Sequence, residues 1–138
     1  MKNNIEFKRG SLEENKNLKE VYVLNHSDPV FAEDESYITP LHIKSAIPQN
    51  DSVMGPSIIL NITKDGMDLL NKVACNDKLP ILILFINGAS FIVYRGIHKL
   101  EKPIAIITVM DMDFAAMVQT LINVAKREEE EGQSRRKT

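Results

Sequence analysis

The sequence lacks most of the features that identify a protein class at once. It has one cysteine, Cys75, and no tryptophan in 138 residues. A single cysteine excludes an internal disulfide and a zinc site built from several cysteines, and it fits a reducing compartment, so a cytoplasmic location is expected. The longest apolar runs, Leu79 to Ile86 and Ile104 to Met110, are well short of the roughly 18 residues that a membrane span needs. No membrane association is expected.

Glycine and surplus charge are also scarce. The 6 glycines lie far apart, which excludes a glycine-rich nucleotide-binding loop of a known type, and no cofactor is expected. Lysine and arginine total 17 against 19 acidic residues, which leaves a formal net charge of -2. This balance supplies neither the basic field of a nucleic-acid binder nor the acidic field of a nucleic-acid mimic, so nucleic acid is not an expected partner.

The composition is otherwise that of one globular domain. Apolar residues make up 43% of the chain and charged residues 26%, which is close to the globular average. The length allows one hydrophobic core but not two. Residues 1–20 are rich in charge and poor in apolar positions, so we predict a flexible charged arm there. Residues 21–125 are predicted to form a single α/β domain, and residues 126–138 a charged disordered tail.

Periodicity and capping residues place the elements. Apolar and β-branched runs predict strands at 21–24, 30–32, 57–63, 80–86, 89–94 and 103–109. Amphipathic segments predict a helix from Asp65 to about Asn76 and a second from Asp111 or Asp113 to Ala125, with the aspartates as caps. Thr39-Pro40 predicts a single helical turn through Ile47. Residues 49–56 are rich in turn formers and are predicted to be a loop.

The dipeptide Asn87-Gly88 is the strongest local signal, because it is typical of a type I′ hairpin turn. The preceding strand, 80–86, is apolar at every position after Pro80, as expected for a strand covered on both faces. A two-residue turn fixes the register of the hairpin. The pairs that it predicts are Ile86 with Ala89, Leu84 with Phe91 and Leu82 with Val93.

Together these elements predict an α+β (mixed α/β) fold in a single domain. The sheet is expected to be mixed, with the Asn-Gly hairpin at its centre and the amphipathic C-terminal helix on one face. The strand, helix and strand between Ser57 and Ile86 are expected to form one βαβ unit with a right-handed crossover.

Three aspartates suggest a metal site. Asp65, Asp111 and Asp113 each follow a predicted strand and open a predicted helix. If strands 57–63 and 103–109 run parallel, these carboxylates meet at one edge of the sheet and suit a divalent cation. Helix capping accounts for each aspartate singly, so both interpretations stay open.

The order of elements over residues 57–125 resembles the second half of nucleases of the PD-(D/E)XK type. The resemblance is one of topology. The strand that would carry the Glu-x-Lys motif of these nucleases reads Leu60-Asn61-Ile62-Thr63, and the nearest substitute, His42-Ile43-Lys44, lies in the predicted turn. The resemblance therefore implies a nuclease-like or hydrolytic metal-dependent enzyme, or an inactive relative of one that only binds.

Residues 25–56 follow local folding rules less closely than the rest of the chain, and such segments often carry function. A polar partner surface is predicted at Glu33, Asp34, Glu35, Tyr37, His42 and Lys44. We therefore expect a small non-enzymatic binding or regulatory protein of the inhibitor or adaptor type, with a protein as its partner. Apolar strands outnumber the helices that could cover them, which predicts a homodimer. High Asn, Lys and Ile usage suggests a low-GC bacterium or its phage.

Overall fold

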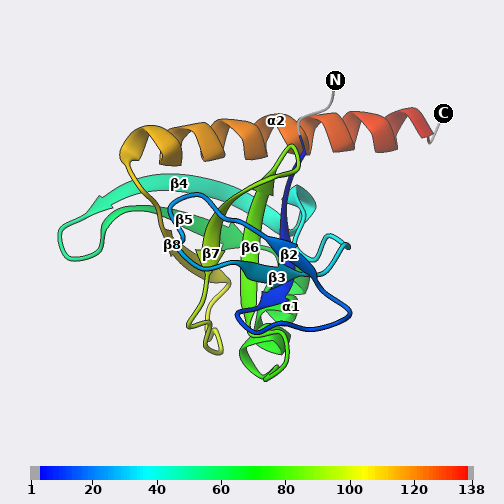
Figure 1. Ribbon diagram of the computed structural model, residues 1–138. Helices are drawn as coiled ribbons and strands as arrows, with labels where there is room; N and C mark the ends of the chain where they lie inside the picture. Colours follow the sequence, from blue (N-terminus) through cyan, green and yellow to red (C-terminus); the bar gives the residue numbers. More distant parts are fainter. Residues whose placement is uncertain (1–3, 137–138) are drawn as a thin grey trace.

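The computed structural model describes residues 4–136, with side chains described through Glu128, as eight strands in two antiparallel sheets with two α-helices (Figure 1). Sheet A has the order β2-β3-β1-β6-β7 and sheet B the order β4-β5-β8. The strands are β1 (Ile5–Ser11), β2 (Lys19–Val21), β3 (Val30–Ala32), β4 (Ile43–Asp51), β5 (Gly55–Ile62), β6 (Ile81–Ile86), β7 (Ala89–Tyr94) and β8 (Ile104–Thr108). The predicted α+β class, the Asn-Gly hairpin and the C-terminal helix are confirmed, whereas the expected mixed sheet with the hairpin at its centre is wrong, because both sheets are antiparallel and β7 is an edge strand.

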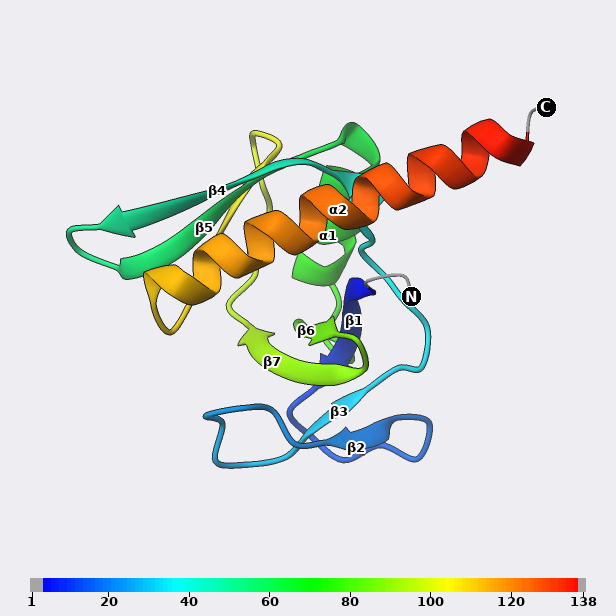
Figure 2. The ribbon, with the colours of Figure 1, turned by 90° about the horizontal axis from the view of Figure 1, so that it is seen from above.

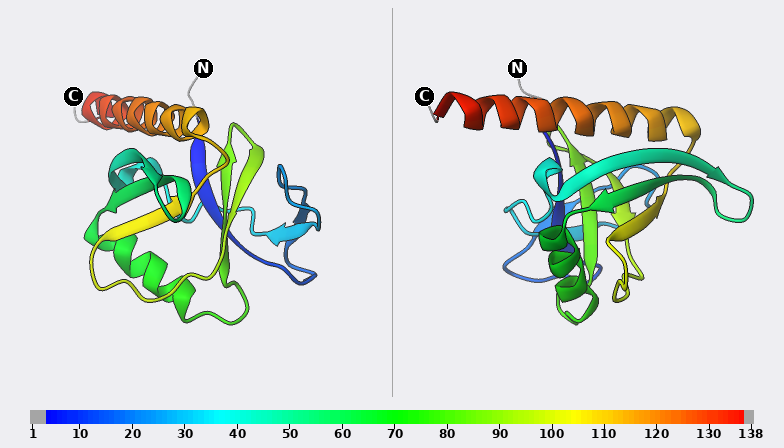
Figure 3. Two further views of the ribbon diagram at one scale, coloured as in Figure 1. Left: turned by 90° about the vertical axis from the view of Figure 1, so that its left-hand side faces the viewer. Right: turned by 180° about the vertical axis from the view of Figure 1, so that it is seen from behind.

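Strand β6 is buried at all six positions, as the sequence predicts. Its inner face, which includes Leu82 and Leu84, belongs to the main core between the two sheets. Its outer face forms a second, smaller core with the segment around β2 and β3. The members of that core are Val23, Val30, Ala32, Ile81, Ile83 and Phe85. The cover that β6 requires is therefore supplied by the N-terminal part of the same chain (Figure 3).

The prediction of an exposed arm over residues 1–20 is wrong for Ile5–Ser11, which is strand β1. It lies between β3 and β6, with Ile5 and Phe7 buried in the main core. The charged residues that suggested an arm are interspersed with these apolar residues in the strand and are only partly buried. Gly10 lets β3 cross close to β1, because a Cβ atom there would lie 2.3 Å from the Phe31 carbonyl oxygen.

Sheet B begins where the sequence suggests a turn and a loop. The helical turn ends at His42, as a 3₁₀ turn over Pro40–His42, instead of continuing through Ile47. From there β4 and β5 form a long hairpin that projects from the body of the protein (Figure 1). The residues assigned to a loop, 49–56, are the ends of these strands and the turn between them. Proline and asparagine are tolerated here because β4 is an edge strand.

Two helices complete the structure. Helix α1 (Lys64–Ala74) begins one residue earlier than expected, since Thr63 is its cap and accepts a hydrogen bond from the Gly66 N–H at 3.0 Å. Helix α2 (Met112–Arg136) is capped by Asp111, whose carboxylate accepts from the Phe114 N–H at 2.7 Å. Figure 2 shows α2 running along β4 and β5 and past the end of β1. The backbone of residues 126–136 is helical, which corrects the disordered tail predicted there, and residues 137–138 lie outside the described residues.

The expected βαβ unit is not formed. Strands β5 and β6 follow one another around α1 in the chain, but β5 belongs to sheet B and β6 to sheet A, and every strand pair is antiparallel. The chain therefore needs no parallel crossover. Helix α1 instead closes the end of the core between the two sheets, where Leu70 and Val73 are buried (Figure 3).

The turn of the Asn-Gly hairpin has the expected conformation, with φ of 50° at Asn87 and 87° at Gly88. Ile86 pairs with Ala89 as predicted, but a bulge then shifts the register by one residue. Leu84 pairs with Ile92 and Leu82 with Tyr94, so the predicted pairs with Phe91 and Val93 are wrong. The shift leaves Phe91 without a cross-strand partner, and its ring packs 5.8 Å from that of Phe114 on α2.

Neither α1 nor α2, over the residues described, is both long and apolar enough to cross a membrane.

Candidate functional site

A hollow of about 650 Å³ opens on the outer face of sheet A, and we call it the sheet A hollow. It lies between β2 and the residues that follow it on one side and the β6–β7 turn on the other. Its floor is apolar and includes Val23, Ala32 and Phe85. Its rim carries charge of both signs, from Lys8, Lys19, Glu20, Glu33 and Asp34. An apolar floor with a polar rim is the usual arrangement of a protein-binding surface.

The backbone around the hollow is held in place by hydrogen bonds between distant parts of the chain. The Leu24 N–H donates to the Ser90 carbonyl at 3.3 Å, and the Ser90 hydroxyl donates to the Tyr22 carbonyl at 2.9 Å. These bonds fix the segment 22–24 against β7. The side chains of Tyr22 and Leu24 are nevertheless 74% and 49% exposed. Two large apolar side chains are thus presented to solvent from a fixed backbone.

Charge interactions shape the floor and rim. The Lys8 ammonium lies 4.8 Å from the centre of the Phe85 ring and 3.6 Å from the Glu6 carboxylate. The Tyr22 hydroxyl donates to the Glu20 carboxylate at 2.7 Å, and this hydrogen bond raises the pKa of Tyr22 above its ordinary value. The tyrosine is therefore neutral and hydrogen-bonded at neutral pH, with the face of its ring open to a partner.

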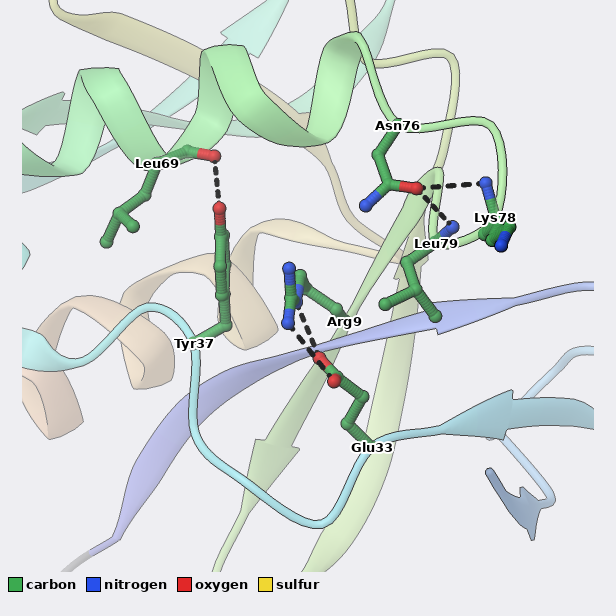
Figure 4. Close-up of polar contacts among 7 residues, drawn as sticks. All are labelled: Arg9, Glu33, Tyr37, Leu69, Asn76, Lys78 and Leu79. Atoms are coloured by element: carbon green, nitrogen blue, oxygen red, sulfur yellow. Dashed lines mark hydrogen bonds and ion pairs between the residues drawn. The ribbon is translucent and has the colours of Figure 1, made fainter. Parts of the chain in front are cut away.

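Two of the predicted binding residues have partners within the fold, as Figure 4 shows. The Glu33 carboxylate forms a two-point ion pair with the Arg9 guanidinium, and one of the two contacts measures 3.1 Å. The same guanidinium lies 4.6 Å from the centre of the Tyr37 ring. The Tyr37 hydroxyl donates to the Leu69 carbonyl at 2.6 Å, and burial raises the pKa of this phenol. These contacts tie β1 and the segment after β3 to α1.

The other predicted binding residues are dispersed. The His42 ring nitrogen accepts from the Thr39 N–H at 3.0 Å and so completes the cap of the 3₁₀ turn. Lys44 lies on β4, where its carbonyl accepts from the Lys126 ammonium of α2 at 2.8 Å. Asp34 and Glu35 are exposed after β3. Of the six residues, only Glu33 and Asp34 line the sheet A hollow.

The arrangement expected for a metal site is not formed. Strands β5 and β8 pair antiparallel, so Asp65, which follows β5, and Asp111, which follows β8, lie beyond opposite ends of sheet B. Asp111 serves as the cap of α2, and Asp113 lies in its first turn. Within the described part of the chain, no group of three or more His, Cys, Asp or Glu side chains is placed to hold a metal ion. Cys75 is exposed at the end of α1.

Sequence reasoning missed the residues that make the hollow. Tyr22 and Leu24 lie in a run that we assigned to a strand of the core, and Lys8 in a segment assigned to an arm. The chain carries no local signal for the hollow, because its walls come from β2, β3 and the β6–β7 hairpin, far apart in sequence. Comparisons with models of protein families, with curated proteins and with solved structures find no match.

Proposed function

We propose that this chain is a small non-enzymatic binding protein that holds a segment of another protein in the sheet A hollow. The observation that carries the proposal is the exposure of Tyr22 and Leu24 on a backbone fixed by Ser90. Aromatic and aliphatic anchors that are held rigidly lose little conformational entropy on binding, and they dominate the energetics of protein interfaces. A role as an inhibitor or adaptor, which acts by occupying its partner, fits such a surface.

The rim indicates the chemistry of the partner. The lining includes the basic residues Lys8 and Lys19 and the acidic residues Glu20 and Asp34. A segment with an apolar side chain flanked by one acidic and one basic residue would match this mixed charge. The single cysteine fits a protein of the cytoplasm, where such a partner would be met.

In the experiment, peptides that bind the full chain are selected from a displayed random library. The affinity of the most enriched peptide is then measured by calorimetry. We expect Tyr22→Ala to weaken the binding of that peptide by about tenfold or more, since an anchor residue typically contributes over 1 kcal/mol. Val53→Ser is the matched control, because Val53 is 91% exposed at the far tip of the β4–β5 hairpin. Unchanged affinity in Tyr22→Ala, or equal losses in both variants, would contradict the proposal.

The proposal includes a homodimer. The sequence predicts that the apolar strands 80–86 and 103–109 must both be covered by other segments. For β6, a segment of the same chain provides this cover. Strand β8 does not, since its alternate positions Ile104, Ile106 and Thr108 are exposed. One face of β8 therefore keeps exposed apolar side chains, and a second copy is its simplest cover.

A further inference from the structure

The two sheets have four edge strands, and three of them are protected against pairing with another chain. Strand β2 is only three residues long and carries Lys19 and Glu20. Strand β4 contains Pro48, and α2 packs along it. Strand β7 is joined to the segment 22–24 through Ser90. Short length, charge, proline and a covering segment are the usual means of blocking an edge.

Strand β8 lacks the charge and the proline, and only a hollow of about 290 Å³ separates its Ile106–Thr108 part from the end of β7 and the residues after it. Its five residues, Ile104–Thr108, include no charged residue and no proline, and it pairs with β5 on one side only. Figure 1 shows β8 at the margin of sheet B. An uncharged edge strand with unpaired backbone groups is a template for a further strand.

The ladder with β5 shows which backbone groups point outward. The Ile62 N–H donates to the Pro103 carbonyl at 2.9 Å, and the Val109 N–H donates to the Pro56 carbonyl at 3.0 Å. Hydrogen-bonded positions alternate along an antiparallel strand. The backbone N–H and C=O groups of residues 105 and 107 therefore also face β5, and those of residues 104, 106 and 108 face the free edge. Over residues 4–136, no hydrogen bond is made by the N–H of Ile106 or Thr108.

The outer face of sheet B carries a row of isoleucines that ends at this edge. Ile47, Ile59 and Ile106 are direct neighbours across the three strands. Ile47 and Ile106 are each 46% exposed, and Ile104 is 39% exposed. Beside the row on the same face, the Asn61 amide donates to the Ser45 hydroxyl at 2.8 Å. The row would continue into any strand added beside β8.

We propose that two copies of the chain pair antiparallel along β8, about a two-fold axis through Ile106. In this register the outward groups of the two strands face one another. Each Ile106 N–H donates to the Ile106 carbonyl of the other copy, and each Thr108 N–H donates to the Ile104 carbonyl opposite it. The two sheets B become one sheet of six strands, and the isoleucine row runs unbroken across it. This inference rests on the homodimer of the proposed function.

A second copy fits this edge better than an unrelated segment does. A strand that meets itself brings like residues together, so any charge in β8 would be repelled by its own copy, and β8 has none. The central residue of the strand is Ile106, which places an apolar side chain on the axis. Cross-strand contact between the two Ile106 side chains covers the exposed end of the row on each copy.

The test is a charge swap at the axis, read by sedimentation equilibrium on the full chain. The apparent mass of the native protein is expected to rise from 15.6 kDa toward twice that value as its concentration increases through the micromolar range. Ile106→Lys and Ile106→Glu should each stay monomeric, because like charges then meet on the axis, and an equimolar mixture of the two should regain the dimer. Ile47→Lys and Ile47→Glu are the matched controls, since Ile47 is equally exposed but two strands away. Each should still dimerise alone.

A native protein that is monomeric at every concentration would overturn the proposal, and so would a mixture of the Ile106 variants that stays monomeric. Loss of the dimer in the Ile47 variants as well would show that the sheets pack face to face instead. The two proposals fail separately: Ile106→Lys should still bind the peptide selected on the sheet A hollow, and Tyr22→Ala should still form the dimer.

Discussion

Sheet A and sheet B bury their apolar residues to different degrees. In sheet A the central strand β6 is buried at every position, with a core on each face. In sheet B the strand β8 alternates between buried and exposed isoleucines, and only its inner face has a core. Both strands are apolar in sequence, so the composition of a strand does not decide its cover. The difference lies in which segments of the chain return to pack on it.

This contrast separates stability from self-association. The N-terminal segment gives sheet A its second layer, and the small core beneath it holds the walls of the sheet A hollow in place. Among residues 4–128, no comparable segment covers the outer face of sheet B, where Ile47, Ile104 and Ile106 stay exposed. We therefore expect substitutions in sheet A to change the free energy of unfolding, and exposed substitutions in sheet B to change association.

The largest expected effect is that of Ile83→Ala in β6. Ile83 is fully buried, and removing its side chain should lower the free energy of unfolding by about 2–5 kcal/mol through lost burial and a cavity. Ile47→Ala in β4 is the comparison, and at 46% exposure it should cost less than about 1 kcal/mol. Denaturant unfolding of both variants checks this. Equal losses would remove the distinction between the sheets.

A smaller effect is expected at the turn that joins β6 to β7. Gly88 has a φ of 87°, and no atom lies within 4 Å of a Cβ placed there, so the cost of Gly88→Val comes from backbone strain alone. We expect about 1–2 kcal/mol. Ala89→Val adds a similar side chain at the next, exposed position, where a β-branched residue suits the strand. A melting temperature for Gly88→Val close to that of Ala89→Val would refute the turn assignment.

The acidic residues after β3 should divide into two kinds. Glu33→Ala breaks the two-point ion pair with Arg9, which is partly shielded from water, and should cost about 1 kcal/mol. Asp34→Ala and Glu35→Ala remove exposed charges and should stay within about 0.5 kcal/mol of the native protein. Thermal unfolding of the three single variants gives the comparison. A loss at Asp34 as large as that at Glu33 would show that the ion pair is not what stabilises this segment.

The smallest effect concerns the tip of the β4–β5 hairpin and depends on pH. The Asp51 carboxylate accepts from the Val53 N–H at 2.7 Å and the Met54 N–H at 2.9 Å, and these bonds lower the pKa of Asp51. A lowered folded-state pKa means that the stabilisation is present above the unfolded pKa, near pH 4, and is lost as the pH falls through the folded value. The chemical shifts of the Val53 and Met54 amides should therefore titrate together below about pH 4. Asp51→Ala should abolish that titration.

Local signals predicted much of the fold. The limits of β3 and β7, the buried β6, the Asn-Gly turn and the Asp111 cap all follow from short-range patterns of apolar, turn-forming and capping residues. Strand β1 was missed because its buried positions, such as Phe7, alternate with charges that resemble an exposed arm. Strand β4 was missed because an edge strand tolerates the proline and polar residues that usually indicate a loop.

The candidate sites depend on sheet order, which local patterns do not encode. The three aspartates would converge only if β5 and β8 ran parallel, and these strands are antiparallel. Ile47, Ile59 and Ile106 become neighbours only through the pairing of β4, β5 and β8. The hollow likewise depends on distant contacts, such as the hydrogen bond from the Ser90 hydroxyl of β7 to the Tyr22 carbonyl. Each of these arrangements is set by contacts between distant segments.

Amide hydrogen exchange measured at a low and a high protein concentration tests the contrast between the sheets most directly. The account expects the amides of β6 to exchange slowly at both concentrations, since they open only when the whole domain unfolds. The Ile106 and Thr108 amides should exchange rapidly in the dilute sample and slowly in the concentrated one, because only a second copy provides them with acceptors. Rapid exchange of both amides at high concentration, or β6 amides that exchange as fast as those of β8, would contradict the account.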